Sequence, residues 1–252
     1  MNSFFRMVPV MVAGFLLLSA TGAKGGQPLS PYRHYDSNTF VHGNFKPFFQ
    51  KQWKARPPPE REPQPGPDGE PEFSPLLLPL SVSSFRKVTG PVMPKRLAER
   101  VRELEPEQRK ALEEALVQLL TGYEQLLDQQ DQPLLKLNLA GAFNYLFMSS
   151  YYALSNGQEL SGEQQRSMLR QINAAIAMGL KDRRLSDREK QELYESAVLS
   201  GGIILGLYNE GRDKGQPDQQ KAARELAKEL LEQMMGIRID KVRVEPAAVW
   251  ID

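Results

Sequence analysis

The sequence predicts an all-α fold, a compact bundle of about six helices around one central apolar helix. Three observations predict it. Amphipathic helix patterns follow one another over residues 95–237, with short breaks at Gly, Pro or Asn. No charged residue falls between Lys136 and Glu159, so the helix expected there should be buried on all sides. Serine and asparagine caps stand where several helices should begin.

The first 23 residues have the layout of a signal peptide. Arg6 is followed by an uncharged apolar run over residues 7–18 and then by small residues up to Ala23. This run is about a dozen residues long, whereas a membrane-spanning helix needs about twenty. We therefore expect cleavage, no transmembrane helix in the mature chain, and export to the periplasm or the extracellular space.

Residues 24–94 are expected to be extended or disordered. Their first part is rich in aromatic residues without a helical or strand period, and prolines recur from Pro57 to Pro94. Proline lacks an amide donor and fixes φ, so neither helix nor sheet can persist there. The later part, residues 73–92, is more apolar and is expected to lie along the surface of the helical domain.

The first three helices follow from local signals. A short helix carries Leu97, and Pro106 suits the first position of a second helix, which has the clearest amphipathic stripe in the chain. Asn138 should cap the third helix, residues 139–154. This uncharged helix is the central one.

The fourth and fifth helices open on capping boxes. Ser161 and Ser186 are each followed by Gln or Glu three residues later. The fifth helix contains a Ser-Gly-Gly cluster around Gly201, which weakens the helix unless a neighbour approaches closely. We expect that neighbour to be the central helix.

A sixth helix should begin at Pro217 and stop at Gly236, a typical C-terminal cap. The remaining residues, 238–252, are predicted to form an extended tail that lays Val249 and Trp250 on the bundle. A single strand here would have no evident partner.

Two stretches carry a resemblance to a known family. They are LNLAGAFNYLFMSSYYALSNGQELS, residues 137–161, and LSDREKQELYESAVLSGG, residues 185–202. With the spacing between them, they resemble an uncharacterised family of exported bacterial all-helical proteins with a domain of unknown function. The similarity is expected over residues 96–236, with the aromatic segment peculiar to this protein. The resemblance implies export and a helical domain but no activity and no functional residues.

Composition excludes several classes of function. The chain has 32 basic and 31 acidic residues, and the predicted signal peptide removes one base, so the mature chain is formally neutral. Such a balance lacks the basic footprint of nucleic-acid binding. There is no cysteine, which excludes disulfides, thiolate metal sites and thiol catalysis. These features favour a bacterial envelope protein.

No metal or cofactor is predicted. Both histidines, His34 and His42, lie in the aromatic segment, so the helical domain has none. Glu189, Glu192 and Glu195 are spaced by three, but helical di-metal sites also need a histidine three residues after a glutamate. We interpret the three glutamates as a solvated charged turn, and no catalytic residue stands out.

A polar set in the helices is the candidate ligand site: Asn144, Tyr151, Tyr194 and Glu195. Asn144 and Tyr151 share a face of the central helix, and Tyr194 and Glu195 on the fifth helix could meet them. Buried polar groups need hydrogen-bond partners, so the same convergence can be purely structural or can line a pocket between helices.

The aromatic segment is the candidate partner surface: Tyr32, Tyr35, Phe40, Phe45, Phe48, Phe49 and Trp53. Aromatic residues interleaved with bases on a flexible lead can stack on sugars or dock onto a protein groove. The alternative is that they fold back over the bundle, because so many exposed aromatic side chains are unfavourable in water.

These features predict an exported, non-enzymatic envelope protein, a helical interaction module for a protein or cell-wall partner. The alternative is a small-molecule binder or hydrolase with a polar site between helices. Nucleic acid is not an expected partner.

Overall fold

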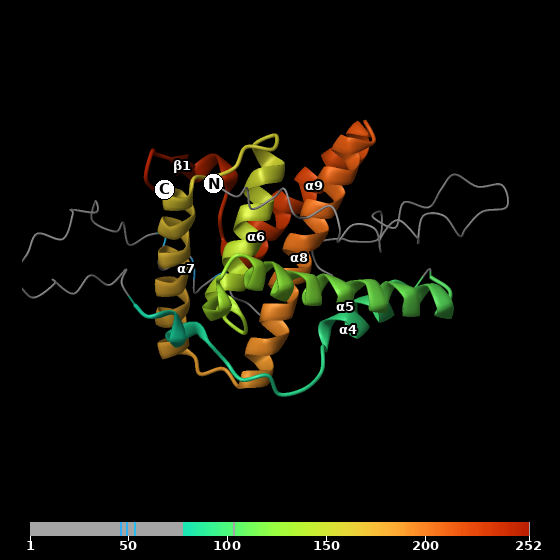
Figure 1. Cartoon of the computed structure of the whole chain (residues 1–252), viewed down its shortest axis with the longest axis horizontal. Helices are drawn as coiled ribbons and strands as arrows, with labels where there is room; N and C mark the ends of the chain where they lie inside the picture. Colours follow the sequence, from blue (N-terminus) through green and yellow to red (C-terminus); the bar gives the residue numbers. More distant parts are fainter. Residues whose placement is uncertain (1–45, 47–48, 50–52, 54–77, 103, 252) are drawn as a thin grey trace, which may run out of the picture.

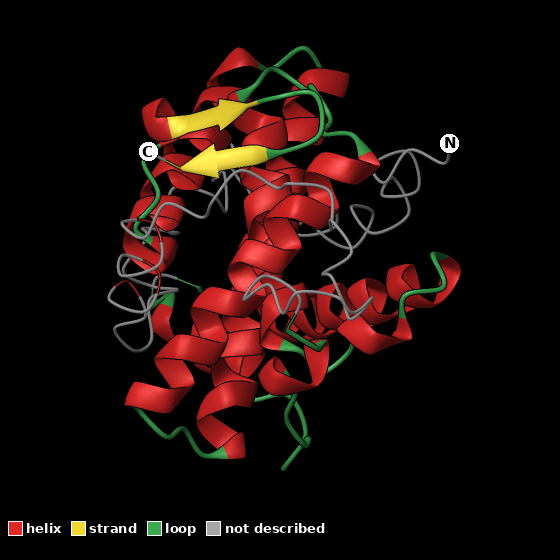
Figure 2. Ribbon diagram, turned by 90° about the vertical axis from the view of Figure 1, so that its left-hand side faces the viewer, coloured by secondary structure: helices red, strands yellow, loops and turns green. Residues whose placement is uncertain are grey.

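The computed structural model describes residues 46, 49, 53, 78–102 and 104–251 of the chain. Over these residues the fold is all-α with one small hairpin, and the predicted helical bundle is confirmed (Figures 1 and 2). The α-helices are α4 (Met93–Arg100), α5 (Pro106–Gln129), α6 (Leu139–Leu154), α7 (Gly162–Asp182), α8 (Asp187–Asp213) and α9 (Pro217–Leu230).

The caps read from the sequence define most of these helices. The Asn138 side chain accepts a hydrogen bond from the Gly141 amide at the start of α6. Ser161 and Ser186 form complete capping boxes at α7 and α8. A single π-helical turn, Leu231–Met235, continues α9 and ends at Gly236, whose left-handed φ of 66° favours glycine.

Helix α6 is the centre of the bundle. It packs against α7, α8 and α9, and Figure 1 shows it standing between α7 and α8. Among its side chains only Asn144, Tyr151 and Leu154 are partly exposed. Helices α4 and α5 pack together and extend to one side of the molecule. In the described part of the chain, no helix combines the length and apolarity needed to cross a bilayer.

Gly201 allows α6 and α8 to approach closely, as the sequence predicts. A Cβ on Gly201 would lie 2.8 Å from Cδ1 of Tyr145 and 3.2 Å from Cα of Leu146. Both neighbours belong to α6, and the second is backbone, which cannot move aside. The lower helix propensity of glycine is therefore offset by helix packing.

Residues 78–92, here called the strap, lie along the bundle. The strap contains a short 3₁₀ turn, Leu80–Ser83, and buries Ser83 and Phe85. The Phe85 amide donates to the carbonyl of Leu137 at 3.0 Å, so the strap pairs with the segment that leads into α6. The expected docking of the apolar part of the linker is thus present over these residues.

Three residues of the aromatic segment are described, and they are helical rather than extended. Phe49 is fully buried, 5.1 Å from the Phe143 ring of α6 and stacked on Trp53 at 5.8 Å. The Trp53 indole donates to the Met235 carbonyl at 2.9 Å. Because these contacts reach residues far along the chain, the local pattern could not reveal them.

The C-terminal tail pairs with itself. Strand β1 (Val242–Val244) runs antiparallel to β2 (Val249–Ile251), and this hairpin lies at one end of the molecule (Figure 2). Val249 is buried, as expected, and its carbonyl accepts a hydrogen bond from Gln171 of α7 at 2.6 Å. The partner missing from the sequence-based interpretation is therefore the tail itself, which turns at Pro246.

The close contact of α6 and α8 predicts that alanine destabilises the protein at Gly201 but not to the same extent at Gly202. Gly201→Ala should lower the free energy of unfolding by about 1–3 kcal/mol, because the new methyl group overlaps α6. Gly202→Ala is the control, since a Cβ there would be 3.4 Å from its nearest neighbour, a Leu119 methyl. Chemical denaturation of both variants measures this, and equal effects at the two positions would contradict the packing argument.

Candidate functional site

The first half of the strap is held by two buried asparagines. Asn138 donates from Nδ2 to the Leu80 carbonyl at 2.7 Å while its Oδ1 caps α6. Asn173 of α7 donates from Nδ2 to the Leu78 carbonyl at 2.9 Å, and its Oδ1 accepts from the Ser83 hydroxyl at 2.7 Å. Side chains therefore satisfy backbone groups that neither helix nor sheet would pair.

The second half is held by two neighbouring side chains of α8. Gln191 accepts from the Val88 amide at 2.9 Å and donates to the Thr89 carbonyl at 3.1 Å. Glu195, only 3 % exposed, accepts from the amides of Val92 and Met93, both at 2.8 Å. Its other oxygen accepts from Gln191 Nε2 at 2.8 Å. Glu195 thus supplies the N-terminal cap of α4, a favourable place for a negative charge.

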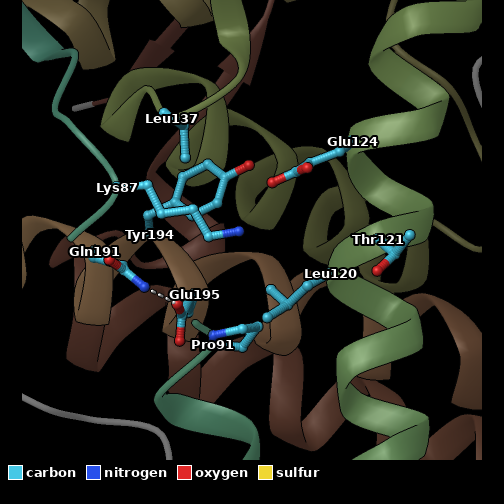
Figure 3. Close-up of a pocket in the computed structure, with 9 residues that line it drawn as sticks. All are labelled: Lys87, Pro91, Leu120, Thr121, Glu124, Leu137, Gln191, Tyr194 and Glu195. Carbon is cyan, nitrogen blue, oxygen red and sulfur yellow. Dashed lines mark hydrogen bonds between the residues drawn. The ribbon is translucent and has the colours of Figure 1, made fainter. Parts of the chain in front are cut away.

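A small pocket lies between the strap, α5 and α8 (Figure 3). Its volume is about 50 Å³, well below the roughly 300–1,000 Å³ of sites for drug-sized ligands. Its polar lining combines one side chain of the strap, two of α5 and three of α8: Lys87, Thr121, Glu124, Gln191, Tyr194 and Glu195.

Three of these groups point into a common space. Figure 3 shows the Tyr194 hydroxyl directed toward the Glu124 carboxylate, with the Lys87 amine extending beside them. Tyr194 is 3 % exposed, and its hydroxyl forms no hydrogen bond of normal geometry. Gln191 and Glu195, in contrast, are occupied by the strap.

Burial perturbs the phenols around the pocket. Burial raises the pKa of Tyr194, and the charge of Glu124 adds to this shift, while the Leu137 backbone opposes it. Tyr123 lies with its ring 6.1 Å from that of Tyr194, and burial raises its pKa as well. Burial raises the pKa of Tyr145 to about 12. These phenols therefore stay protonated at neutral pH, so each keeps a hydroxyl proton that it can donate.

The structure divides the candidate ligand site. Tyr194 and Glu195 line the same pocket, whereas Asn144 and Tyr151 are not part of its lining. Asn144 keeps a buried Oδ1 without a hydrogen bond, and Tyr151 is partly exposed and stacks on Phe147 at 6.3 Å. Ligand binding by these four residues stays a prediction.

The sequence analysis missed both charged pocket residues other than Glu195, namely Lys87 and Glu124. Lys87 belongs to the strap, where a base in a proline-rich linker carries no signal. Glu124 had one: it stands four residues after Leu120 and directly after Tyr123, both buried, so it borders the apolar stripe of α5.

The three regularly spaced glutamates of α8 diverge in the structure. Glu189 caps its own helix through Ser186, and Glu192 pairs with Arg96 of α4 at 2.9 Å. Burial acts to raise the pKa of Glu192, but hydrogen bonds from two arginines outweigh it and lower the pKa. The interpretation as a solvated turn is wrong for Glu195, which is buried under the strap. Within the part of the chain that the structure describes, no cluster of side chains could hold a metal ion.

The candidate partner residues divide as well. Phe49 and Trp53 pack on the bundle, which is the fold-back arrangement considered as the alternative. The remaining candidates lie outside the described residues, as do both histidines: Tyr32, Tyr35, Phe40, Phe45, Phe48, His34 and His42.

Removing the cap on α4 should weaken the fold. Glu195→Ala leaves the buried Met93 amide and the partly buried Val92 amide without an acceptor, so we expect a loss of about 3 kcal/mol in the free energy of unfolding. Glu192→Ala, three residues earlier on the same helix, removes a partly exposed ion pair and should cost less than about 1 kcal/mol. Urea denaturation of both variants compares them. If Glu195→Ala costs no more than Glu192→Ala, the hydrogen bonds between Glu195 and the strap contribute little to stability.

The buried phenols predict a loss of stability in alkali. The Tyr145 phenol ionises near pH 10 in the unfolded chain and at about 12 in the folded protein. Its contribution is thus fully present below pH 10 and disappears as the pH rises toward 12. Unfolding followed against pH measures the slope, and Tyr145→Phe should flatten it. An unchanged slope in that variant would contradict the assignment.

Comparison with known proteins gives one match. No curated protein and no solved structure shows a significant similarity to the chain. Among protein families, residues 33–250 match a family of unknown function, DUF6683. This match begins well before residue 96, so the aromatic segment, expected to be peculiar to this protein, lies almost wholly within the family region. Since the match covers most of its length, the chain belongs to the DUF6683 family of unknown function.

Proposed function

We propose that this protein is an exported, non-enzymatic envelope protein that acts as a helical interaction module for a protein or cell-wall partner. Export is inferred from the signal-peptide layout of residues 1–23, and a bacterial envelope from that signal together with the absence of cysteine. The role as a binding module rests on the aromatic segment.

The observation that carries this proposal is the anchoring of the aromatic segment. Phe49 is buried against Phe143 of α6, and Trp53 is hydrogen-bonded to Met235 in the π turn after α9. The anchor fixes one end of the segment on the bundle. Partner contacts are expected around this point of attachment, from aromatic residues that precede Phe49.

The buried polar side chains support a scaffold role. Asn138, Asn173, Gln191 and Glu195 each form a hydrogen bond with the strap backbone. Their partners are parts of the fold, which suits a rigid platform that presents a binding segment.

Deleting residues 27–45 should remove partner binding and leave the fold intact, because Phe49 and Trp53 remain in place. The experiment is in-vivo crosslinking of the tagged protein in its native host, with mass spectrometry of the captured material. We expect a specific protein or wall fragment with the full chain and none with the deletion. Equal recovery with both forms would contradict the proposal.

Phe49→Ala is the matched control for this deletion. It should lower the free energy of unfolding by about 3–5 kcal/mol, since it empties a fully buried site. The deletion should leave the melting temperature unchanged. A comparable drop in both would show that the deleted residues serve the fold and not a partner.

A second candidate function is small-molecule binding or hydrolysis between helices. The pocket beside Tyr194 and Glu195 favours the binding part of this alternative. Detection of a turnover reaction would be needed to support a hydrolase.

A further inference from the structure

We propose that the pocket between the strap, α5 and α8 binds a small zwitterion, an α-amino acid with little or no side chain such as glycine. This inference is independent of partner binding through the aromatic segment, because none of the residues involved belongs to that segment.

Two opposite charges line the pocket without neutralising each other. Lys87 comes from the strap and Glu124 from α5, and both extend toward the same space (Figure 3). Within the described part of the chain, neither forms an ion pair or hydrogen bond. Elsewhere in the structure, many such charges are paired, as Arg96 is with Glu192 at 2.9 Å. A ligand with both a positive and a negative end would complete the two groups at once.

The Tyr194 hydroxyl is a third polar group of the pocket that lacks a normal hydrogen bond. Its side chain is 97 % buried, and the hydroxyl is aimed into the pocket without a normal hydrogen bond. A buried polar atom left unsatisfied is unfavourable, and native structures rarely keep one without water or a ligand beside it. Tyr194 can donate to an anion that also contacts Lys87.

Size and wall chemistry limit the ligand. About 50 Å³ is several times the 10–15 Å³ that one water molecule needs, so a few non-hydrogen atoms fit. Leu120, Leu137 and Pro91 supply apolar walls. These walls leave no room for a long side chain.

The arrangement assigns one role to each polar group. The ligand ammonium would lie at the Glu124 carboxylate, and the ligand carboxylate would accept from Lys87 and from the Tyr194 hydroxyl. A simple amine or a simple carboxylate satisfies only one of the two ends. The pocket should therefore prefer the zwitterion to both.

Titration calorimetry of the full chain tests this directly, with four probes: glycine, methylammonium, acetate and leucine. Glycine should bind, methylammonium and acetate should bind at least tenfold more weakly, and leucine should not bind because of its size. No detectable heat with glycine would overturn the proposal. Equal binding of acetate or methylammonium would overturn it too, since the site would then recognise a single charge.

Three substitutions locate the site. Lys87→Met, Glu124→Gln and Tyr194→Phe should each weaken glycine binding roughly tenfold or more, the loss of one hydrogen bond to a charged group. Glu114→Gln, ten residues before Glu124 on the same helix, should leave binding unchanged. Tyr194→Phe removes a hydroxyl that lacks a normal hydrogen bond, so the fold should survive it. Glycine binding that none of the three weakens would place the ligand elsewhere and overturn the assignment.

Discussion

The need to satisfy the backbone of the strap is the constraint on which the rest of the structure depends. An irregular segment packed against helices has amides and carbonyls that cannot pair with one another. Gln191 and Glu195 meet this need from α8, more than ninety residues later in the sequence. Because Glu195 also caps α4, the same carboxylate fixes the end of the strap and the start of the helical hairpin that extends from the bundle. Lys87 and Pro91 line the pocket only while the hydrogen bonds from Gln191 and Glu195 hold the strap in place.

Local chemistry accounts for most of the helices. Asn138, Ser161 and Ser186 cap α6, α7 and α8 where the sequence places them, and Gly201 marks a close contact between α6 and α8. These signals act over a few residues or require only a small side chain, so they are visible without the fold. The hairpin of the tail was predicted only in part. An extended tail was expected, but its two strands are too short for the sequence pattern to predict that they pair with each other.

The sequence revealed only part of the candidate site, because long-range contacts bring its residues together. Tyr194 and Glu195 stood out because polar residues on a buried helix need partners, yet their partners and neighbours come from distant segments. Glu195 was interpreted as solvated because Arg188 and Lys190 are interleaved with the regularly spaced glutamates, but helix geometry turns it inward under the strap. Phe49 shows the same limit of sequence analysis. Only its contact with Phe143, far along the chain, shows that it is a core residue and not a surface aromatic residue.

Amide hydrogen exchange at Val92 and Met93 tests the central claim most directly, because both amides donate to Glu195. If Glu195 holds the strap, both amides should be protected from exchange in the wild-type protein. In Glu195→Ala both should lose that protection, while the amides in the middle of α6 keep theirs. Exchange at the rate of free backbone in the wild type would contradict the account, since the strap would then be only loosely attached to the bundle.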